Sequence, residues 1–406
     1  MREGAGSVTH APRPRRCPTP RRARLAALPL VALVVGLAAS GCSSSNGNAH
    51  AATKGTTAAE SCASSAPGGT LGAACDTKTP AETLTGAGAN SIAPFFTRAF
   101  YDYNQADHGV TVNYSPAGSS VGVTDIEQGT VQFGDSEVPI PAPATGTNGA
   151  ILQLPVDLGG VALSYNLPGV TAIKLDGPTL AGIFLGTITK WNDRAIAALN
   201  PGITLPDTAV VPVHRADSSG PGYDLDQYLI DTGGSAWTSK VGTKSTTHWP
   251  LSTVGVGEQL NTGVATYLKQ TPGAIGYVEY AYSAQAKFTD AALKNAAGAY
   301  VSPSTSSIAA AGSSASGLSA TDFDIVNGPG RATYPLANFS WTLLDQKQTS
   351  TDVGETLGHL FDWVVTTGQD EAKALGYSPL PANAVTLARQ TLLQLQSPSG
   401  TELFTS

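Results

Sequence analysis

Residues 209–230 read AVVPVHRADSSGPGYDLDQYLI, and this stretch contains one complete unit of an α/β fold. The apolar run Ala209–Val213 predicts a strand, the polar segment His214–Gly220 a turn, and Tyr223–Ile230 a helix. The same order of strand, small-residue turn and helix also occupies residues 83–100 and 110–128. Because such alternation is typical of parallel sheets covered by helices, we predict an α/β fold.

Three turns in these units are rich in small residues, at 86–91, 118–122 and 215–222. In a parallel α/β sheet, ligands bind at the carboxyl ends of the strands, where helix N-termini present unpaired N–H groups. The three turns are therefore candidate binding sites for an anion. A fourth stretch, Gly134–Glu137, lies in a further predicted strand and adds a carboxylate.

The third turn has the chemistry of an oxyanion site. The Arg215 guanidinium offers planar donors that match an oxyanion, and Asp217 is placed to orient it by a salt bridge. Ser219 can cap the following helix and donate its hydroxyl to a ligand. The same residues would also suit a surface ion pair followed by an ordinary helix cap, so the turn alone leaves both interpretations open.

The second turn supports a different hypothesis. Gly118–Gly122 matches the G-x-S-x-G pattern of hydrolases, in which Ser120 would be the nucleophile. His214, His248 or His359 would then act as its base. A pattern of small residues is common in a chain with 45 glycines, and no acid and histidine pair is marked as its partner. A serine helix cap and an anion site are the alternatives that we favour.

The first 41 residues are typical of an export signal. Arginines precede the apolar run Leu25–Ala39, which is too short to span a membrane comfortably. Small residues then stand directly before Cys42, so we predict a lipoprotein signal peptide over residues 1–41 and lipidation at Cys42. An ordinary secretory signal with an incidental cysteine is the alternative.

Two segments have a low-complexity composition. Residues 42–80 contain almost no large apolar side chain and predict a flexible tether. Cys62 and Cys75 lie in it, either as a disulfide or as two free thiols. Residues 302–319 have the composition of a surface loop, whereas apolar residues at helical spacing in 357–364 predict an amphipathic helix.

The net charge argues against nucleic acid as a partner. The whole chain carries −7, and without residues 1–41 it would hold 16 basic and 29 acidic residues. Because a negatively charged protein repels anions, a bound anion would depend on local donors. No further membrane segment is visible in the sequence.

Several long segments also occur in the same order in one known family. They are LTGAGA at 84–89, VNY at 112–114, GSS at 118–120, YNLPGV at 165–170, IFLGTITKWND at 183–193, ALNPG at 198–202, HRADSSG at 214–220, QTPGAIGYVEYAY at 270–282 and FDW at 361–363. From about Thr83 to about Val385 the chain resembles the periplasmic phosphate-binding proteins of high-affinity phosphate ABC transporters.

The resemblance implies a two-lobed periplasmic binding protein fold, type II-like, with two hinge strands and inorganic phosphate held between the lobes. We accordingly predict that residues 81–157 and 335–406 form one lobe and residues 158–334 the other. The resemblance further implies a monomer without cofactor or metal that catalyses no reaction and docks on the permease subunits of an ABC importer. With its lipid anchor, this protein would lie outside the cytoplasm, on the outer face of the cell membrane.

The ligand residues of that family fall on four positions of this chain, with one residue in support. They are Ser119 in GSS, Arg215, Ser219 and Gly220 in HRADSSG, and the supporting Asp217. All of them lie in the second and third small-residue turns, where helix N-termini are expected. The resemblance and the chemistry of the turns therefore predict the same anion site.

Four positions depart from the family pattern. Asn90 and Ser91 replace a threonine and a phenylalanine, but Asn90 keeps a side-chain donor and Ser91 a backbone N–H, so both stay candidate ligands. Glu137 replaces a shorter carboxylate and keeps an acceptor for the proton of hydrogen phosphate, which is how such a site rejects sulfate. Pro221 replaces a threonine and lacks the N–H that the family gives to its ligand. We therefore expect weaker phosphate binding or a shifted anion preference.

Three other functions remain open on the sequence. The first is a relative that binds a different oxyanion, or that senses rather than transports. The second is a secreted serine hydrolase that uses Ser120. The third is a structural cell-surface protein that kept the fold and lost the ligand.

Overall fold

The computed structural model describes residues 69–71, 82–106, 109–141, 143–320 and 324–405, which belong to one structural unit of the chain. The predicted signal peptide, the predicted lipidation site Cys42 and most of the predicted tether with its two cysteines lie outside these residues. Residues 69–71 are an exception to the predicted tether. There, β1 (Gly69–Thr70) pairs in parallel with β15 (Phe404–Thr405), a partner that the local composition does not reveal.

Within the described residues, a ten-stranded sheet has the order β3-β2-β4-β14-β6-β10-β8-β9, with β5 and β11 as additional partners of β6. Its strands are β2 (Glu82–Gly88), β3 (Val110–Ser115), β4 (Phe133–Ser136), β5 (Thr145–Gly146), β6 (Gly149–Tyr165), β8 (Val211–Arg215), β9 (Val256–Glu258), β10 (Ala274–Glu279), β11 (Thr289–Asp290) and β14 (Ala337–Asp345). The pairs at both ends of the sheet are parallel, as predicted. In the middle, β6 and β14 run antiparallel to each other and to their outer neighbours.

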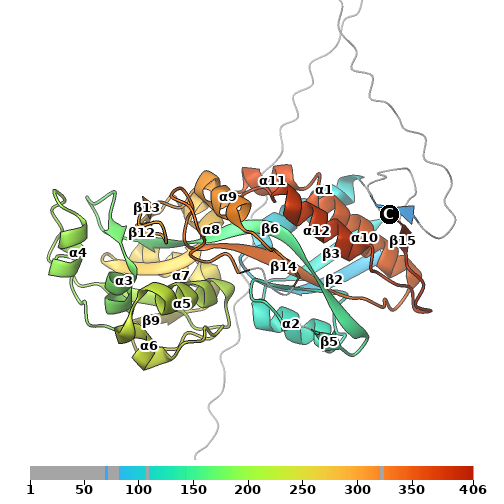
Figure 1. The fold of residues 1–406 in the computed structure, drawn as a ribbon, viewed down its shortest axis with the longest axis horizontal. Coiled ribbons are helices and arrows are strands. Elements are labelled where there is room, and N and C mark those ends of the chain that lie inside the picture. The colour runs from blue at the N-terminus through green and yellow to red at the C-terminus, as the bar shows by residue number, and fades with distance from the viewer. Residues whose placement is uncertain (1–68, 72–81, 107–108, 142, 321–323, 406) are drawn as a thin grey trace, which may run out of the picture. The chain divides into compact units, whose positions relative to one another are not determined.

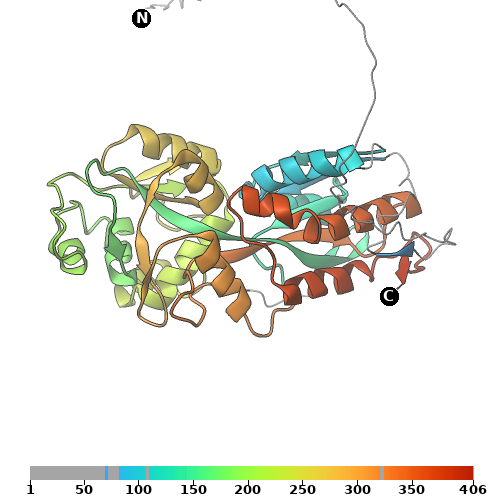
Figure 2. The ribbon, with the colours of Figure 1, turned by 90° about the horizontal axis from the view of Figure 1, so that it is seen from above.

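Helices gather around the two ends of this sheet, and we call the two groups the first and the second lobe (Figures 1 and 2). The first lobe contains β2 to β4 with α1 (Ala93–Ala106), α2 (Ser119–Glu127), α10 (Thr351–Val365), α11 (Gln369–Ala374) and α12 (Ala382–Leu392). The second lobe contains β8 to β10, α3 (Gly177–Phe184), α4 (Arg194–Leu199), α5 (Gly220–Thr232), α6 (Ser235–Val241), α7 (Leu260–Gln270), α8 (Tyr280–Ala286) and the small sheet of β7 (Lys174–Leu175), β12 (Ala292–Lys294) and β13 (Tyr300–Val301).

Two long strands, β6 and β14, run between the lobes (Figure 1). Along residues 151–160, β6 pairs with β14, and along residues 161–165 it pairs with β10 of the second lobe. The two lobes therefore share one sheet, and any change in their relative orientation has to bend these two strands.

The first lobe shows why the predicted units fold as strand, turn and helix. In α1 the buried aromatic residues Phe95, Phe96 and Phe100 recur at helical spacing, and the last two contact the Phe133 ring. A Cβ atom on Gly86 would lie 2.1 Å from that ring, so β2 passes this cluster because it has no side chain there. The predicted helices at 223–230 and 357–364 are confirmed as parts of α5 and α10. No helix in the described part of the chain combines the length and the apolar character needed to cross a membrane.

The segment 302–319 contains a helix, α9 (Thr305–Ser314), so the expectation of a surface loop is wrong for most of it. The Ser304 side chain caps its N-terminus. Ile308 is fully buried, and its side chain fills the space above Gly160 of β6. Contacts with a distant strand therefore hold this helix, which its composition of small residues does not reveal.

Candidate functional site

The N-termini of two helices, one from each lobe, meet at Glu137. Helix α2 begins at Ser119 in the first lobe, and α5 begins at Gly220 in the second. Glu137 directly follows β4, and its backbone N–H donates to Ser119 Oγ (3.3 Å). On its other side, a Cβ atom on Gly220 would lie 2.3 Å from Glu137 Oε2. Turns that are distant in the sequence thus converge. We use the name anion site for the residues that the sequence analysis predicts to bind an anion: Asn90, Ser91, Ser119, Glu137, Arg215, Ser219 and Gly220.

Arg215 supplies the positive charge of this site, and only 2% of its surface is exposed. It ends β8, and the predicted salt bridge with Asp217 is present. Nε donates to Oδ1 (2.7 Å) and Nη2 donates to Oδ2. Because a guanidinium has five N–H groups, this pairing leaves three of them for a ligand.

Asp217 is itself fixed from a second direction. Its Oδ1 also accepts the backbone N–H of Leu260 (3.0 Å), the first residue of α7. Burial raises the pKa of Asp217, but the hydrogen bonds and charge of Arg215 outweigh burial and hold that pKa below its ordinary value. The carboxylate therefore stays ionised and orients the guanidinium.

Ser219 and Gly220 lie at the N-terminus of α5. Ser219 Oγ accepts the Gly222 N–H (2.9 Å), which is the helix cap that the sequence predicts. Gly220 has no room for a side chain because the Glu137 carboxylate lies against it. Pro221 follows in the first turn and has no N–H, so the helix N-terminus has one donor fewer than usual.

Ser120 lies in α2, and its hydrogen-bond partners are other hydroxyl groups. Its hydroxyl is hydrogen bonded to Ser218 Oγ and lies 3.4 Å from Thr247 Oγ1. None of its hydrogen-bond partners in the described part of the chain is an imidazole. The three candidate bases have other contacts: His214 Nδ1 lies 3.1 Å from the Arg215 carbonyl oxygen, His248 Nδ1 3.4 Å from Thr247 Oγ1, and the His359 ring against Phe404.

Asn90 and Ser91 precede α1 and differ in their contacts. Asn90 Oδ1 accepts the Asn261 N–H (2.9 Å), and its carbonyl oxygen accepts the Tyr282 hydroxyl (3.0 Å), so Asn90 bonds twice to the second lobe. The Ser91 hydroxyl is buried and has no hydrogen bond of good geometry to any of the described residues. It nevertheless lies close enough to Glu137 to lower the pKa of that carboxyl. Ser91 therefore has an unused donor next to the acceptor of the site.

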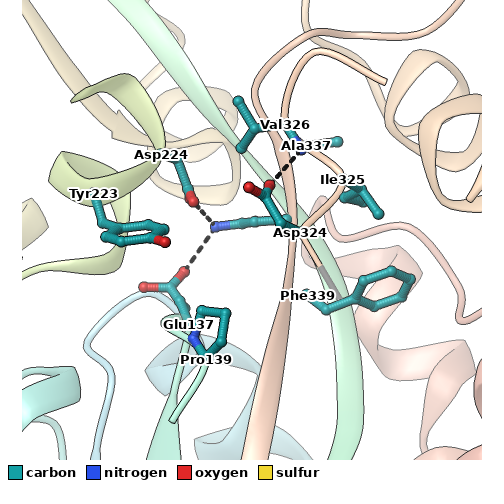
Figure 3. A pocket seen from close by; sticks show the side chains of 10 residues that line it. Glu137, Pro139, Tyr223, Asp224, Asp324, Ile325, Val326, Ala337 and Phe339 are labelled. Carbon is teal, nitrogen blue, oxygen red and sulfur yellow. Dashed lines mark hydrogen bonds between the residues drawn. The ribbon is translucent and has the colours of Figure 1, made fainter. Parts of the chain in front are cut away.

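Opposing effects act on the pKa of the Glu137 carboxyl. Burial raises its pKa from 4.5 to about 7, against the opposing effects of the Ser91 hydroxyl, the Arg215 charge and the Asn338 amide. The Asn338 amide donates both to Glu137 Oε1 (3.2 Å) and to Asp224 Oδ2 (2.7 Å). In Figure 3, dashed lines join the carboxyls of Glu137 and Asp224 to the nitrogen of this amide.

Four further buried carboxyls surround Glu137, and the sequence analysis did not single them out. They are Asp135 on β4, Asp157 on β6, Asp224 on α5 and Glu279 at the end of β10. Burial is the largest cause of the raised pKa of each one, and the charge of Glu137 adds to it. Asp135 lies on β4 and Glu137 directly after it, and this spacing of two residues is the signal that could have shown a pair of acids on one side of the sheet. Nothing near Asn338 in the sequence marks it.

A small cavity adjoins the site, between Glu137, Tyr223, Asp224, Asp324 and Asn338 (Figure 3). Its volume is about 10 Å³, which is room for about one water molecule. Among the described residues, no group of three or more histidine, cysteine or acidic side chains has a geometry that could hold a metal ion. The chemistry of the site is therefore that of a buried arginine, a carboxyl, hydroxyls and backbone N–H groups.

Comparison with protein families and curated proteins identifies related chains. A family model described as a PBP superfamily domain matches residues 49–367. The phosphate-binding protein PstS of Xylella fastidiosa (strain 9a5c) is 41% identical over 314 residues, which cover 76% of this chain and 84% of that protein. The phosphate-binding protein PstS of Pasteurella multocida (strain Pm70) is 38% identical over 311 residues, which cover 76% and 89%.

Solved structures show the same fold at lower sequence identity. A high affinity periplasmic phosphate-binding protein, solved with bound phosphate, matches with a TM-score of 0.61 at 19% identity over 76% of this chain and 93% of that chain. A phosphate-binding protein from Stenotrophomonas maltophilia matches with a TM-score of 0.61 at 18% identity over 80% and 99%. The predicted periplasmic binding protein fold is thereby confirmed.

Proposed function

This chain belongs to the PBP superfamily and to the family of the phosphate-binding proteins named PstS, and on that premise we propose that it captures inorganic phosphate for an ABC importer. One observation supports this function above all others. A buried guanidinium with three N–H groups left for a ligand lies in the same interlobe site as a buried carboxyl that can accept a proton.

This pairing of donor and acceptor suits hydrogen phosphate. Arg215, the Ser119 and Ser91 hydroxyls, and the start of α5 at Ser219 and Gly220 would donate to its oxygens. Ionised Glu137 would accept its remaining proton. Sulfate has no proton at neutral pH, so its oxygens would face the carboxylate without a hydrogen bond, and the site would reject it.

The two lobes would close around this ligand by bending β6 and β14. We propose the lobe boundaries predicted from the sequence, with residues 81–157 and 335–406 in one lobe, 158–334 in the other, and hinges near Asp157 and Tyr334. In support, β6 exchanges β14 for β10 as its partner after residue 160, and β14 begins at Ala337.

The cellular location and the binding partners of the protein follow from the same proposal. We propose that Cys42 carries a lipid that anchors the protein outside the cytoplasm, where it binds as a monomer and docks on the permease subunits. Cys42→Ala would then release the protein into the medium or leave it unprocessed. Membrane association that survives this substitution would contradict the anchor.

Calorimetric titration with phosphate, arsenate and sulfate tests the function. We expect binding of phosphate and arsenate, no comparable binding of sulfate, and no serine-dependent hydrolysis of esters. Arg215→Ala should weaken phosphate binding by about a hundredfold or more, because it leaves the anion and Asp217 without their charged donor. A preference for sulfate would instead identify the protein as a receptor for a different oxyanion. Turnover that is lost in Ser120→Ala would identify a hydrolase.

A further inference from the structure

One face of β14 lies against the carboxyls of the anion site. Asn338 and Ser340 alternate along this strand, so their side chains point to the same side of the sheet. The Asn338 amide donates to Glu137 and Asp224, and the Ser340 hydroxyl donates to Asp135 Oδ1 (2.8 Å). Each of these two residues therefore holds buried carboxyls from neighbouring elements.

Asn338 and the start of α5 lie at different oxygens of the Glu137 carboxyl. The N–H groups of Asn338 meet Glu137 Oε1, whereas Oε2 lies against Gly220 at the start of α5. Only 5% of the Asn338 surface is exposed, so solvent has little access to replace this donor. Since Glu137 belongs to the first lobe and Asp224 to the second, the amide fixes the carboxylate relative to both lobes.

The surroundings of Glu137 otherwise favour its protonated form. The titratable groups around it are Asp135 on β4, Asp157 on β6, Asp224 on α5, Glu279 at the end of β10, Arg215 on β8, and Tyr114, Tyr282 and Tyr377. Tyr223 and Asp324 line the adjoining cavity with Glu137. Three groups lower its pKa, namely Ser91, Arg215 and Asn338. Because Ser91 and Arg215 would bind the anion themselves, Asn338 is the one of the three whose effect is independent of the ligand.

We propose that Asn338 is a positioning residue for anion recognition: its amide holds Glu137 as an ionised acceptor and thereby sets the preference for an anion that carries a proton. This inference rests on the proposed function. Without the amide, Glu137 takes up a proton from solvent and becomes a donor. A hydrogen-bond donor at that position binds sulfate as readily as hydrogen phosphate. Discrimination between the two anions therefore falls, although the residues that touch the ligand are unchanged.

The titration of Glu137 in the ligand-free protein tests this role. Asn338→Leu removes both N–H groups with a side chain of similar size. In carbon-13 NMR of protein labelled at glutamate, we expect the pKa of Glu137 to rise by about one pH unit or more, the equivalent of one hydrogen bond to a charged group. The signal of Glu137 is identified by its loss in Glu137→Gln. If circular dichroism shows that Asn338→Leu is unfolded, Asn338→Ser replaces it, because one hydroxyl cannot donate to two carboxylates.

Ser340→Ala is the matched control, since it removes a donor to a buried carboxyl from the same face of the same strand. It should leave the titration of Glu137 unchanged. Calorimetry at pH 7 should show that the ratio of phosphate to sulfate affinity falls by about tenfold in the Asn338 variant and stays constant in the control. If the pKa of Glu137 in the ligand-free protein is unchanged, or shifts equally in both variants, the proposed role of Asn338 is overturned. This result does not depend on any ligand. A wild-type protein that binds no phosphate would overturn the proposed function instead.

Discussion

Pro221 stands in the first turn of α5, directly after the Ser219–Gly220 pair that we propose to bind the anion. Pro221→Thr supplies an N–H and a hydroxyl, and each new bond to a charged ligand contributes about 1.5–3 kcal/mol. We expect this variant to tighten phosphate binding by about tenfold or more in a calorimetric titration. Pro221→Ala restores the N–H alone, so its phosphate affinity should lie between those of Pro221→Thr and the wild type. Weaker binding by Pro221→Thr would show that the site is built around another ligand.

Asp157 gives the stability of the protein an unusual dependence on pH. Burial and then the charge of Glu137 raise its pKa from 3.8 to about 8. Between these values the folded state binds more protons than the unfolded state, so the free energy of unfolding falls as pH rises through this window. For one group the slope is at most about 1.4 kcal/mol per pH unit.

Asp157→Asn should therefore flatten the decline in melting temperature between pH 5 and 8. The amide oxygen can still accept the Ser340 N–H, which the Asp157 carboxylate accepts at 3.2 Å. Asp207→Asn is a suitable control, because the Asp207 side chain is 62% exposed. This substitution should leave the decline in melting temperature between pH 5 and 8 unchanged. A decline that is equally steep in Asp157→Asn would show that this carboxyl is ionised in the folded protein.

Among the helices, α9 offers a direct test of packing against the shared sheet. Its Ile308 side chain is fully buried over Gly160 of β6. Ile308→Ala should lower the free energy of unfolding by about 2–5 kcal/mol, as for other buried isoleucines, measured by denaturant titration. Ser306→Ala, at an exposed position of the same helix, should change it by less than about 0.5 kcal/mol. Equal and small effects of both substitutions would mean that α9 is detached from β6 in solution.

The same helix shows where sequence patterns stop being informative. Helix α10 was predictable because its apolar residues recur at helical spacing and pack on the sheet next to it. In α9 one large apolar residue, Ile308, stands among alanines, serines and glycine, so no periodic pattern forms. Its helical state depends on small side chains that fit closely against β6, which is a property of two distant segments together.

The anion site was likewise only partly predictable from the sequence. Arg215, Asp217 and Ser219 lie in one turn, and the sequence predicts both their salt bridge and their helix cap because those contacts are local. The convergence of Ser119, Glu137 and Gly220 follows only with the resemblance to a family. Asn338, Asp157 and Glu279 became visible as neighbours of Glu137 only with the sheet order, because strands β4, β14, β6 and β10 are neighbours in space and not in the chain.

At the scale of the whole molecule, the lobes are joined by hydrogen bonds as well as by the two shared strands. Asn90 bonds to Asn261 and Tyr282, and Ser120 bonds to Ser218. These contacts would favour the closed arrangement that we propose, in which Arg215 of the second lobe lies near Glu137 of the first. A ligand that touches both residues would stabilise the same arrangement, so closure and binding would be thermodynamically coupled.

Asn90→Ala tests this coupling, because it weakens a contact between the lobes and leaves Arg215 and the start of α5 in the second lobe unchanged. It leaves the Asn261 N–H buried and unsatisfied, so the closed form loses about 1–3 kcal/mol relative to the open form. At subsaturating phosphate, small-angle scattering should show a larger radius of gyration than for the wild type, and phosphate affinity should fall by about tenfold. Asn113→Ala, an exposed asparagine of the same lobe, should change neither quantity. If Asn90→Ala lowers affinity while scattering at each level of saturation matches the wild type, Asn90 acts as a direct ligand, and closure is controlled by the hinge strands alone.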